Sequence, residues 1–210
     1  VQLVKLGEGG AQALYRITVL FLRLKDAKTA RTYLAKAKSA GDTDKKTWFE
    51  IGEAFAKLGY SSTAIEAYDN CLRKDASMED ALLKVAALLE KTKKDSAAAE
   101  RYMELYQLDK SKNKEYLEKA AQLFDKSGAS SKAHKAYTSA SKNSSMGVKG
   151  KLRLAELEFD KKNYKAVIEL LGDLPESQVS LKAAVLLSES CFAVKNYKKA
   201  LEYVTLILKK

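Results

Sequence analysis

Apolar side chains recur at helical spacing in the most strongly patterned stretch of the chain, TWFEIGEAFAKLGYSSTAIEAY, residues 47–68. Offsets of three, four and seven positions place one set on a single helix face. This set is Trp48, Ile51, Gly52 and Phe55. After a break at Gly59, Ala64 and Tyr68 begin a second set with the same spacing. The pattern predicts two short helices joined by a turn.

Small residues stand inside both predicted helices, at positions that could hold larger buried side chains. Gly52 costs up to ~1 kcal/mol in helix propensity relative to alanine. Two helices of a hairpin approach closely only where their side chains are small, so we interpret Gly52 and Ala64 as the contact point of the pair. Gly59 suits the residue that ends a helix. These small residues therefore predict architecture rather than an active site.

The pattern returns along the whole chain with a spacing of 33 to 35 residues. The anchors of the second helices are Ala30, Ala64, Ala98, Ala133, Val167 and Ala200. Twelve residues before each anchor stands another small residue: Thr18, Gly52, Ala86, Ala121, Ala155 and Ser188. Six tandem helix pairs are predicted within a single domain. Their approximate bounds are 11–44, 45–78, 79–112, 113–147, 148–180 and 181–210.

The second unit resembles the tetratricopeptide repeat (TPR) family, whose pattern is Trp, Leu-Gly, Tyr, Gly, Ala, Phe/Tyr, Ala and Pro. The matching positions are Trp48, Ile51, Gly52, Phe55, Gly59, Ala64, Tyr68, Cys71 and Ala76. The resemblance covers roughly residues 11–210 and implies an all-α fold, a right-handed α-solenoid of antiparallel helix pairs. It departs at Glu158, where an aromatic residue is expected, and we expect Phe159 to substitute there.

The resemblance also implies a non-catalytic scaffold that binds a protein or peptide on a concave surface lined by the first helices. The expected ligand can include acidic residues. TPR chaperone adaptors hold a C-terminal carboxylate with Lys, Asn and Arg, and the corresponding positions here, such as Val19 and Glu53, do not match. The groove candidates are Tyr15, Arg16, Val19, Arg23, Phe49, Glu50, Glu53, Lys57, Lys84, Lys91, Arg153, Glu156, Glu189 and Phe192.

The two ends of the chain do not follow the repeat as closely. Residues 1–10 are interpreted as the end of a preceding helix followed by a turn at Gly7–Gly10. At the other end, Val204, Ile207 and Leu208 form an apolar stripe with no following unit to cover it. Because solenoids normally end in a polar cap, we expect further repeats or another subunit there. The chain, which begins without methionine, is interpreted as a fragment of a longer one.

Composition supports the helical prediction, and charge raises an alternative function. The chain has one proline and is 46% apolar and 31% charged, as expected for a globular protein without a membrane span. Its formal net charge of +11 is compatible with nucleic-acid binding. Most lysines, however, fall in turns and second helices rather than in one basic stripe with aromatics. A basic nucleic-acid-associated solenoid and a structural subunit of a larger assembly remain the alternatives.

Residues that would indicate catalysis, a metal or a cofactor are scarce. His134 is the only histidine, whereas a metal site needs several ligands at fixed spacing. Cys71 and Cys191 lie 120 residues apart in apolar contexts and are interpreted as core filler. The sequence predicts no catalytic residue, metal or cofactor, and it does not decide the cellular compartment.

Overall fold

The computed structural model describes residues 7–111, 114–142 and 146–209, and these residues are almost entirely helical. The elements are α1 (Gly7–Arg23), α2 (Ala27–Ala40), α3 (Lys45–Lys57), α4 (Ser61–Lys74), α5 (Glu79–Lys91), α6 (Asp95–Leu108), α7 (Lys114–Lys126), α8 (Ser130–Lys142), α9 (Val148–Asp160), α10 (Tyr164–Leu171), the 3-10 helix η2 (Glu176–Gln178), α11 (Leu181–Ala193) and α12 (Tyr197–Leu208). The predicted all-α class is confirmed.

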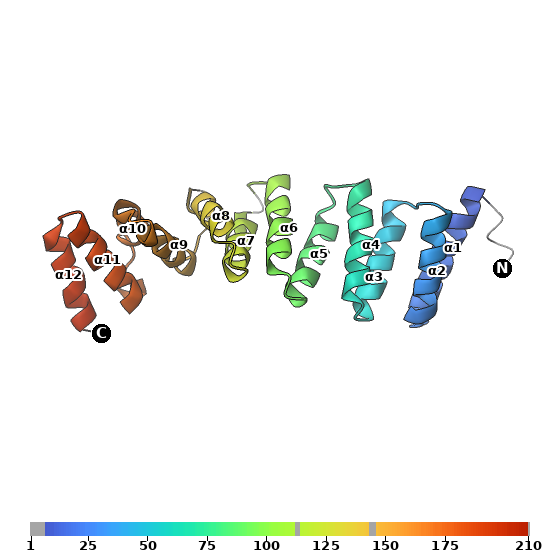
Figure 1. Cartoon of the computed structure of the whole chain (residues 1–210), viewed down its shortest axis with the longest axis horizontal. Helices are drawn as coiled ribbons and strands as arrows, with labels where there is room; N and C mark the ends of the chain where they lie inside the picture. The colour runs from blue at the N-terminus through green and yellow to red at the C-terminus, as the bar shows by residue number, and fades with distance from the viewer. Residues whose placement is uncertain (1–6, 112–113, 143–145, 210) are drawn as a thin grey trace. The chain divides into compact units, whose positions relative to one another are not determined.

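Consecutive helices pack as antiparallel pairs, which gives six hairpins in the described part of the chain (Figure 1). The hairpins fall into two compact units, residues 1–109 with α1–α6 and residues 110–210 with α7–α12. Within the first unit, α1 packs on α3 and α4 packs on α5. Within the second, α9 contacts α11 and α10 contacts α11. The prediction of one continuous domain stays a prediction.

Both small-residue columns are buried, but the side chain that lies against Gly52 is Tyr68 rather than the predicted Ala64. All six anchors are buried, from 0% exposed at Ala30 to 7% at Ala200. At Gly52 a Cβ atom would lie 2.7 Å from the ring of Tyr68, a distance that real Cβ atoms do not adopt. The ring of Tyr68, itself fully buried, therefore occupies the space that Gly52 leaves free. The cost in helix propensity is offset by this close packing.

Each hairpin turns through the same capped geometry. In the second hairpin the N–H of Tyr60 donates to the carbonyl of Phe55 at 2.9 Å, and the N–H of Gly59 donates to that of Ala56 at 3.1 Å. This is the Schellman arrangement, which needs one residue with positive φ. The residues in that position are Lys25, Gly59, Lys93, Gly128, Lys162 and Lys195. Glycine thus ends two of the first helices, and lysine takes the same backbone conformation in the other four.

The first hairpin begins earlier than predicted. The turn expected at Gly7–Gly10 is wrong, because these residues form the first turns of α1. Gly10 and Ala11 are buried, and Ala11 packs close to Gly41 in the loop that follows α2. This contact favours the helix despite the low propensity of glycine. The preceding helix expected before Gly7 lies outside the described residues.

Glu158 itself occupies the column in which an aromatic residue was expected. It is 9% exposed, at the position equivalent to the buried Phe55 and Phe124. Phe159 does not replace it, since Phe159 is only half-buried and contacts Tyr164 edge-on at 5.5 Å. The expected substitution is therefore wrong. A helix turns about 100° per residue, so a neighbouring side chain cannot point into the same space.

Candidate functional site

A cavity of about 480 Å³ lies between the first helices of the first two hairpins. Its apolar surface comes from Val19 and Leu22 of α1 and from Phe49 and Ala54 of α3. The ring of Phe49 is positioned by an edge-on contact with Tyr68 at 5.4 Å. The complete lining is Val19, Leu22, Arg23, Lys25, Phe49, Glu50, Glu53, Ala54, Lys57 and Leu58.

Charged side chains form the rim of this cavity. Glu53 pairs with Lys84 at 2.8 Å and with Lys57 at 3.8 Å, and it accepts a hydrogen bond from the Tyr68 hydroxyl at 2.9 Å. The Lys84 contact outweighs partial burial and lowers the pKa of Glu53, so the carboxylate stays ionised. This ion pair joins Glu53 of the second hairpin to Lys84 of the third. Arg23, Lys25 and Glu50 make no ion pair with the described residues.

Six of the residues predicted from the sequence line this one cavity: Val19, Arg23, Phe49, Glu50, Glu53 and Lys57. Arg16 and Lys91 are exposed on α1 and α5 but do not line it. Sequence reasoning missed Leu22, Ala54 and the two turn residues Lys25 and Leu58. The signal for the turn residues was their place at the ends of α1 and α3, next to predicted groove positions.

Tyr15 is a core residue and not a groove residue. It is 1% exposed, and its ring packs edge-on against Trp48 at 5.1 Å. Its hydroxyl donates to the carbonyl of Gly41 at 3.1 Å. Burial, together with the nearby Asp42, raises the pKa of Tyr15 to about 12. The expected groove position fails because Tyr15 faces the neighbouring hairpin, which the helical pattern of one hairpin cannot reveal.

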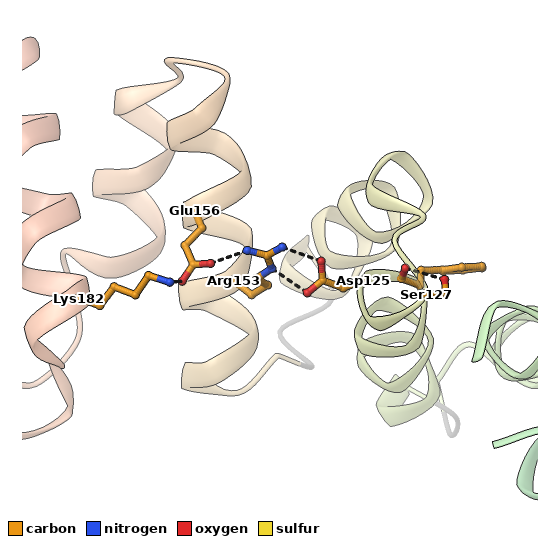
Figure 2. A network of polar contacts seen from close by, with 6 residues as sticks. Asp125, Ser127, Arg153, Glu156 and Lys182 are labelled. Carbon is orange, nitrogen blue, oxygen red and sulfur yellow. Dashed lines mark hydrogen bonds and ion pairs between the residues drawn. The ribbon is translucent and has the colours of Figure 1, made fainter. Parts of the chain in front are cut away.

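In the second unit, two candidates belong to an ion-pair ladder that joins three first helices (Figure 2). Arg153 of α9 donates to Asp125 of α7 through two nitrogens, at 2.7 and 2.8 Å. It also bonds Glu156 at 2.6 Å, and Glu156 pairs with Lys182 of α11 at 2.6 Å. Hydrogen bonds from Arg153 to Asp125 and then Glu156 raise the pKa of Arg153. Arg153 and Glu156 thus join the hairpins that begin with α7, α9 and α11 through ion pairs.

The last hairpin presents apolar side chains to solvent. Phe192 is 66% exposed and contacts only the edge of Tyr197 among the described rings, at 5.4 Å. Glu189 is exposed on the same helix. On α12, Val204 is 41% and Leu208 is 82% exposed. The equivalent residues of α4, Tyr68 and Leu72, are buried, at 0% and 8%.

The potential chemistry of the described residues is limited. They include no group of three or more His, Cys, Asp or Glu that could hold a metal. His134 lies 2.6 Å from Glu158, which also accepts from Asn163 at 2.9 Å. Burial alone would raise the pKa of Glu158, but the hydrogen bonds from His134 and Asn163 lower it on balance. The pair joins α8 to α9 within the second unit.

The two cysteines are core residues. Cys71 and Cys191 are fully buried, and burial raises the pKa of both thiols, which lowers their reactivity. Among the helices of the described ranges, none is long and apolar enough to cross a membrane.

Comparison with solved structures identifies the fold. A chain of the Naa15/Naa10 complex bound to HypK-THB matches 95% of this chain with a TM-score of 0.67 and 11% identity. This chain spans about a third of that one, 32%. YrrB, a TPR protein with an unusual peptide-binding site, matches 79% of the chain and 86% of its own length, with a TM-score of 0.51 and 12% identity. The chain has the tetratricopeptide repeat fold.

A TPR repeat-containing protein from Cytophaga hutchinsonii gives the same result over more of the chain. It covers 95% of this chain and 83% of its own, with a TM-score of 0.51 and 13% identity. No protein-family model matches the sequence, and comparison with curated proteins finds no match. TPR folds are typically protein–protein interaction scaffolds and are generally non-catalytic. The cavity between α1 and α3 lies between two first helices of this TPR chain.

Proposed function

We propose that this TPR chain is a non-catalytic scaffold that binds an extended peptide segment of a partner protein in the cavity between α1 and α3. The observation that supports it is the convergence of six sequence-predicted residues on one cavity with an apolar floor and a charged rim. A volume of about 480 Å³ is large enough for one or two side chains of such a segment.

The chemistry of the cavity specifies the kind of segment. Val19 and Phe49 offer apolar surface for one hydrophobic side chain. Arg23 and Lys25 leave two positive charges at one rim, whereas Glu53 is already engaged by Lys84. An apolar residue next to an acidic one is therefore the expected recognition element. A buried aromatic anchor with a charged rim is a common arrangement at protein interfaces.

Affinity capture followed by mass spectrometry, and then titration of the captured peptide, tests this proposal. Arg23→Glu is expected to weaken binding at least about tenfold, because it reverses a rim charge next to the expected acidic residue. Arg16→Glu is the matched control, since Arg16 is an exposed arginine of the same helix that lies outside the cavity. Phe49→Ala should also abolish capture. An unchanged set of partners in Arg23→Glu and Phe49→Ala contradicts the proposal.

The nucleic-acid alternative finds less support in the structure. Several outward lysines are paired with carboxylates rather than free for phosphates: Lys38 with Glu66, Lys74 with Asp42, and Lys45 with Asp75. An oligonucleotide would have to displace these partners. A steep dependence of oligonucleotide affinity on salt would revive the alternative.

A second proposal follows from the exposed face of α12. Leu201, Val204 and Leu208 are between 41% and 82% exposed. On α4, which contacts α5, the equivalents of Val204 and Leu208 are the buried Tyr68 and Leu72. We propose that this face receives another helical hairpin, from a further repeat or another subunit. Light scattering of the full-length native protein over a concentration series tests it, and a native chain that ends at Lys210 and stays monomeric at the highest concentrations contradicts it.

A further inference from the structure

A second cavity of the first unit, of about 620 Å³, lies between the second helices α2 and α4. Its walls come from Lys38 of α2, from the loop residue Asp42 and from Trp48. Along α4 they include Asn70 and Arg73. The cavity shares no residue with the cavity between α1 and α3. It is therefore a separate site from the one assigned to the peptide segment.

Most charges in this cavity are satisfied by one another. Asp42 accepts a hydrogen bond from the Trp48 indole at 2.9 Å and pairs with Lys74. Lys38 of α2 pairs with Glu66 of α4. These contacts connect the first hairpin to the second and hold the walls in place. They also place two carboxylates at the edge of the cavity.

Two polar side chains are left without such a contact. The Asn70 residue is 8% exposed, and its side chain makes no hydrogen bond to any described residue. The Arg73 guanidinium makes no ion pair at contact distance in the described ranges and only attracts Asp69 from farther away. The amide atoms of Asn70 still reach solvent, because Ser190 Oγ is the one buried side-chain polar atom without a partner in the described ranges, and Arg73 is exposed. Residues three apart on a helix share a face, so both donors can reach one ligand.

We propose that this cavity binds a carboxylate, with the Arg73 guanidinium and the Asn70 amide as its donors. The planar fork of arginine matches a carboxylate through two parallel hydrogen bonds, and the amide supplies another N–H. A phosphate fits less well, because its second negative charge would be repelled by Asp42 and Glu66. The carboxylate can come from a peptide C-terminus, an acidic side chain or a free small acid. The inference goes beyond the proposed peptide groove and does not depend on it.

Trp48 provides a direct reporter, because it is the only tryptophan of the chain and its indole lies in the cavity wall. We would follow the Trp48 indole and Asn70 amide signals by NMR during titration with four probes. These are N-acetyl-Ala-Gly as the free acid, the same dipeptide as its C-terminal amide, N-acetyl-Glu-Gly amide, and sodium acetate. Inorganic phosphate is the competing anion.

Saturable shifts with any carboxylate probe, absent with the Ala-Gly amide, support the proposal. The comparison of the three carboxylate arms then identifies the source. The proposal is overturned by equal shifts with the Ala-Gly amide, by saturation with phosphate alone, or by no saturable shift with any probe.

Variants separate a binding role from a structural one. Arg73→Gln should weaken the carboxylate probe about tenfold, because it removes a charge-assisted bidentate contact. Arg73→Lys, which keeps the charge and loses the fork, should lie in between. Lys46→Gln, an exposed lysine of α3 outside the cavity, is the matched control for net charge and should change affinity less than about twofold.

Asn70→Leu should abolish the response with little change in thermal unfolding, because the amide that it removes makes no hydrogen bond to a described residue. Full carboxylate affinity in both Arg73→Gln and Asn70→Leu would overturn the assignment of the donors.

Discussion

The second and fifth hairpins form the same turn with different side-chain chemistry. In the second, the N–H of Tyr60 caps the carbonyl of Phe55, and the two rings meet edge-on at 6.1 Å. In the fifth, the N–H of Asn163 caps the carbonyl of Glu158 at 2.9 Å, and their side chains form a hydrogen bond. The backbone bonds are the same, whereas an apolar contact in one hairpin is a polar contact in the other.

The difference shows that the repeat constrains the backbone more strongly than the chemistry of each column. A Schellman turn needs its two backbone bonds and one positive φ, and it also favours a side-chain contact across the turn. Apolar packing supplies that contact in the second hairpin. In the fifth, Glu158 is buried only because His134 and Asn163 satisfy its carboxylate. A buried carboxylate without such partners would be strongly destabilising.

The largest expected effect compares two phenylalanines, one from each of these hairpins. Phe55 is fully buried, so Phe55→Ala should lower the free energy of unfolding by about 3–5 kcal/mol. Phe159 is half-buried beside the polar column, and Phe159→Ala should cost clearly less. Urea unfolding followed by circular dichroism measures both. Equal losses would mean that Phe159 fills the core in place of Glu158.

An intermediate effect is expected from the polar column. Glu158→Gln should cost about 1.5–3 kcal/mol at neutral pH, because it weakens hydrogen bonds to a charged group. The pKa of Glu158 is lowered in the folded state from its ordinary value of 4.5. Its contribution is therefore fully present above that value and is lost as pH falls through the folded pKa.

The difference in stability between wild type and Glu158→Gln should accordingly shrink below pH 4.5. The loss caused by Phe55→Ala should not depend on pH, because no titrating group is removed. Glu169→Gln, at an exposed position of α10, is the control for loss of a carboxylate. A difference for Glu158→Gln that stays constant down to acidic pH would contradict the polar-column interpretation.

The smallest effect comes from exchanging the turn residues. Gly59 and Lys162 have φ values of +83° and +60°. Gly59→Lys should destabilise the chain by about 1 kcal/mol, and Lys162→Gly should stabilise it by up to about that amount, because only glycine adopts this region without strain. Lys161→Gly, next to it with a φ of −85°, should instead destabilise. Thermal unfolding of each variant and of the wild type measures these changes in stability. A loss of stability in Lys162→Gly would show that the Lys162 side chain contributes contacts.

The fold was predictable because the same pattern of small and large residues recurs in six units. A single small residue such as Gly52 is ambiguous, but small residues in one column of every unit predict the same helix contact throughout. The predicted units from the second onward start at 45, 79, 113, 148 and 181, and the first helices begin at Lys45, Glu79, Lys114, Val148 and Leu181. The prediction failed at Gly7–Gly10. The low helix propensity of glycine indicated a turn there, but packing of the first turns of α1 favours a helix.

The candidate site was predictable only in part, since the prediction used one hairpin at a time. Helical spacing predicted Val19 and Phe49 as positions outside the core, and both are half-buried in the lining of the cavity between α1 and α3. It could not show that Tyr15 packs on the next hairpin, or that Glu53 is held by Lys84. It also missed Asn70 and Arg73, whose cavity forms between two hairpins.

The sequence by itself determined the helices, their pairing and the burial of the small-residue columns, because these depend on spacing within one repeat and on side-chain size. Only the tertiary structure decided which charges are paired, how the polar column residue Glu158 is accommodated, and which side chains remain without partners. The physical reason is that hydrogen bonds and ion pairs depend on atoms within about 3–4 Å of each other. Stacked hairpins bring together residues roughly 30 positions apart, and no local pattern specifies which of them meet.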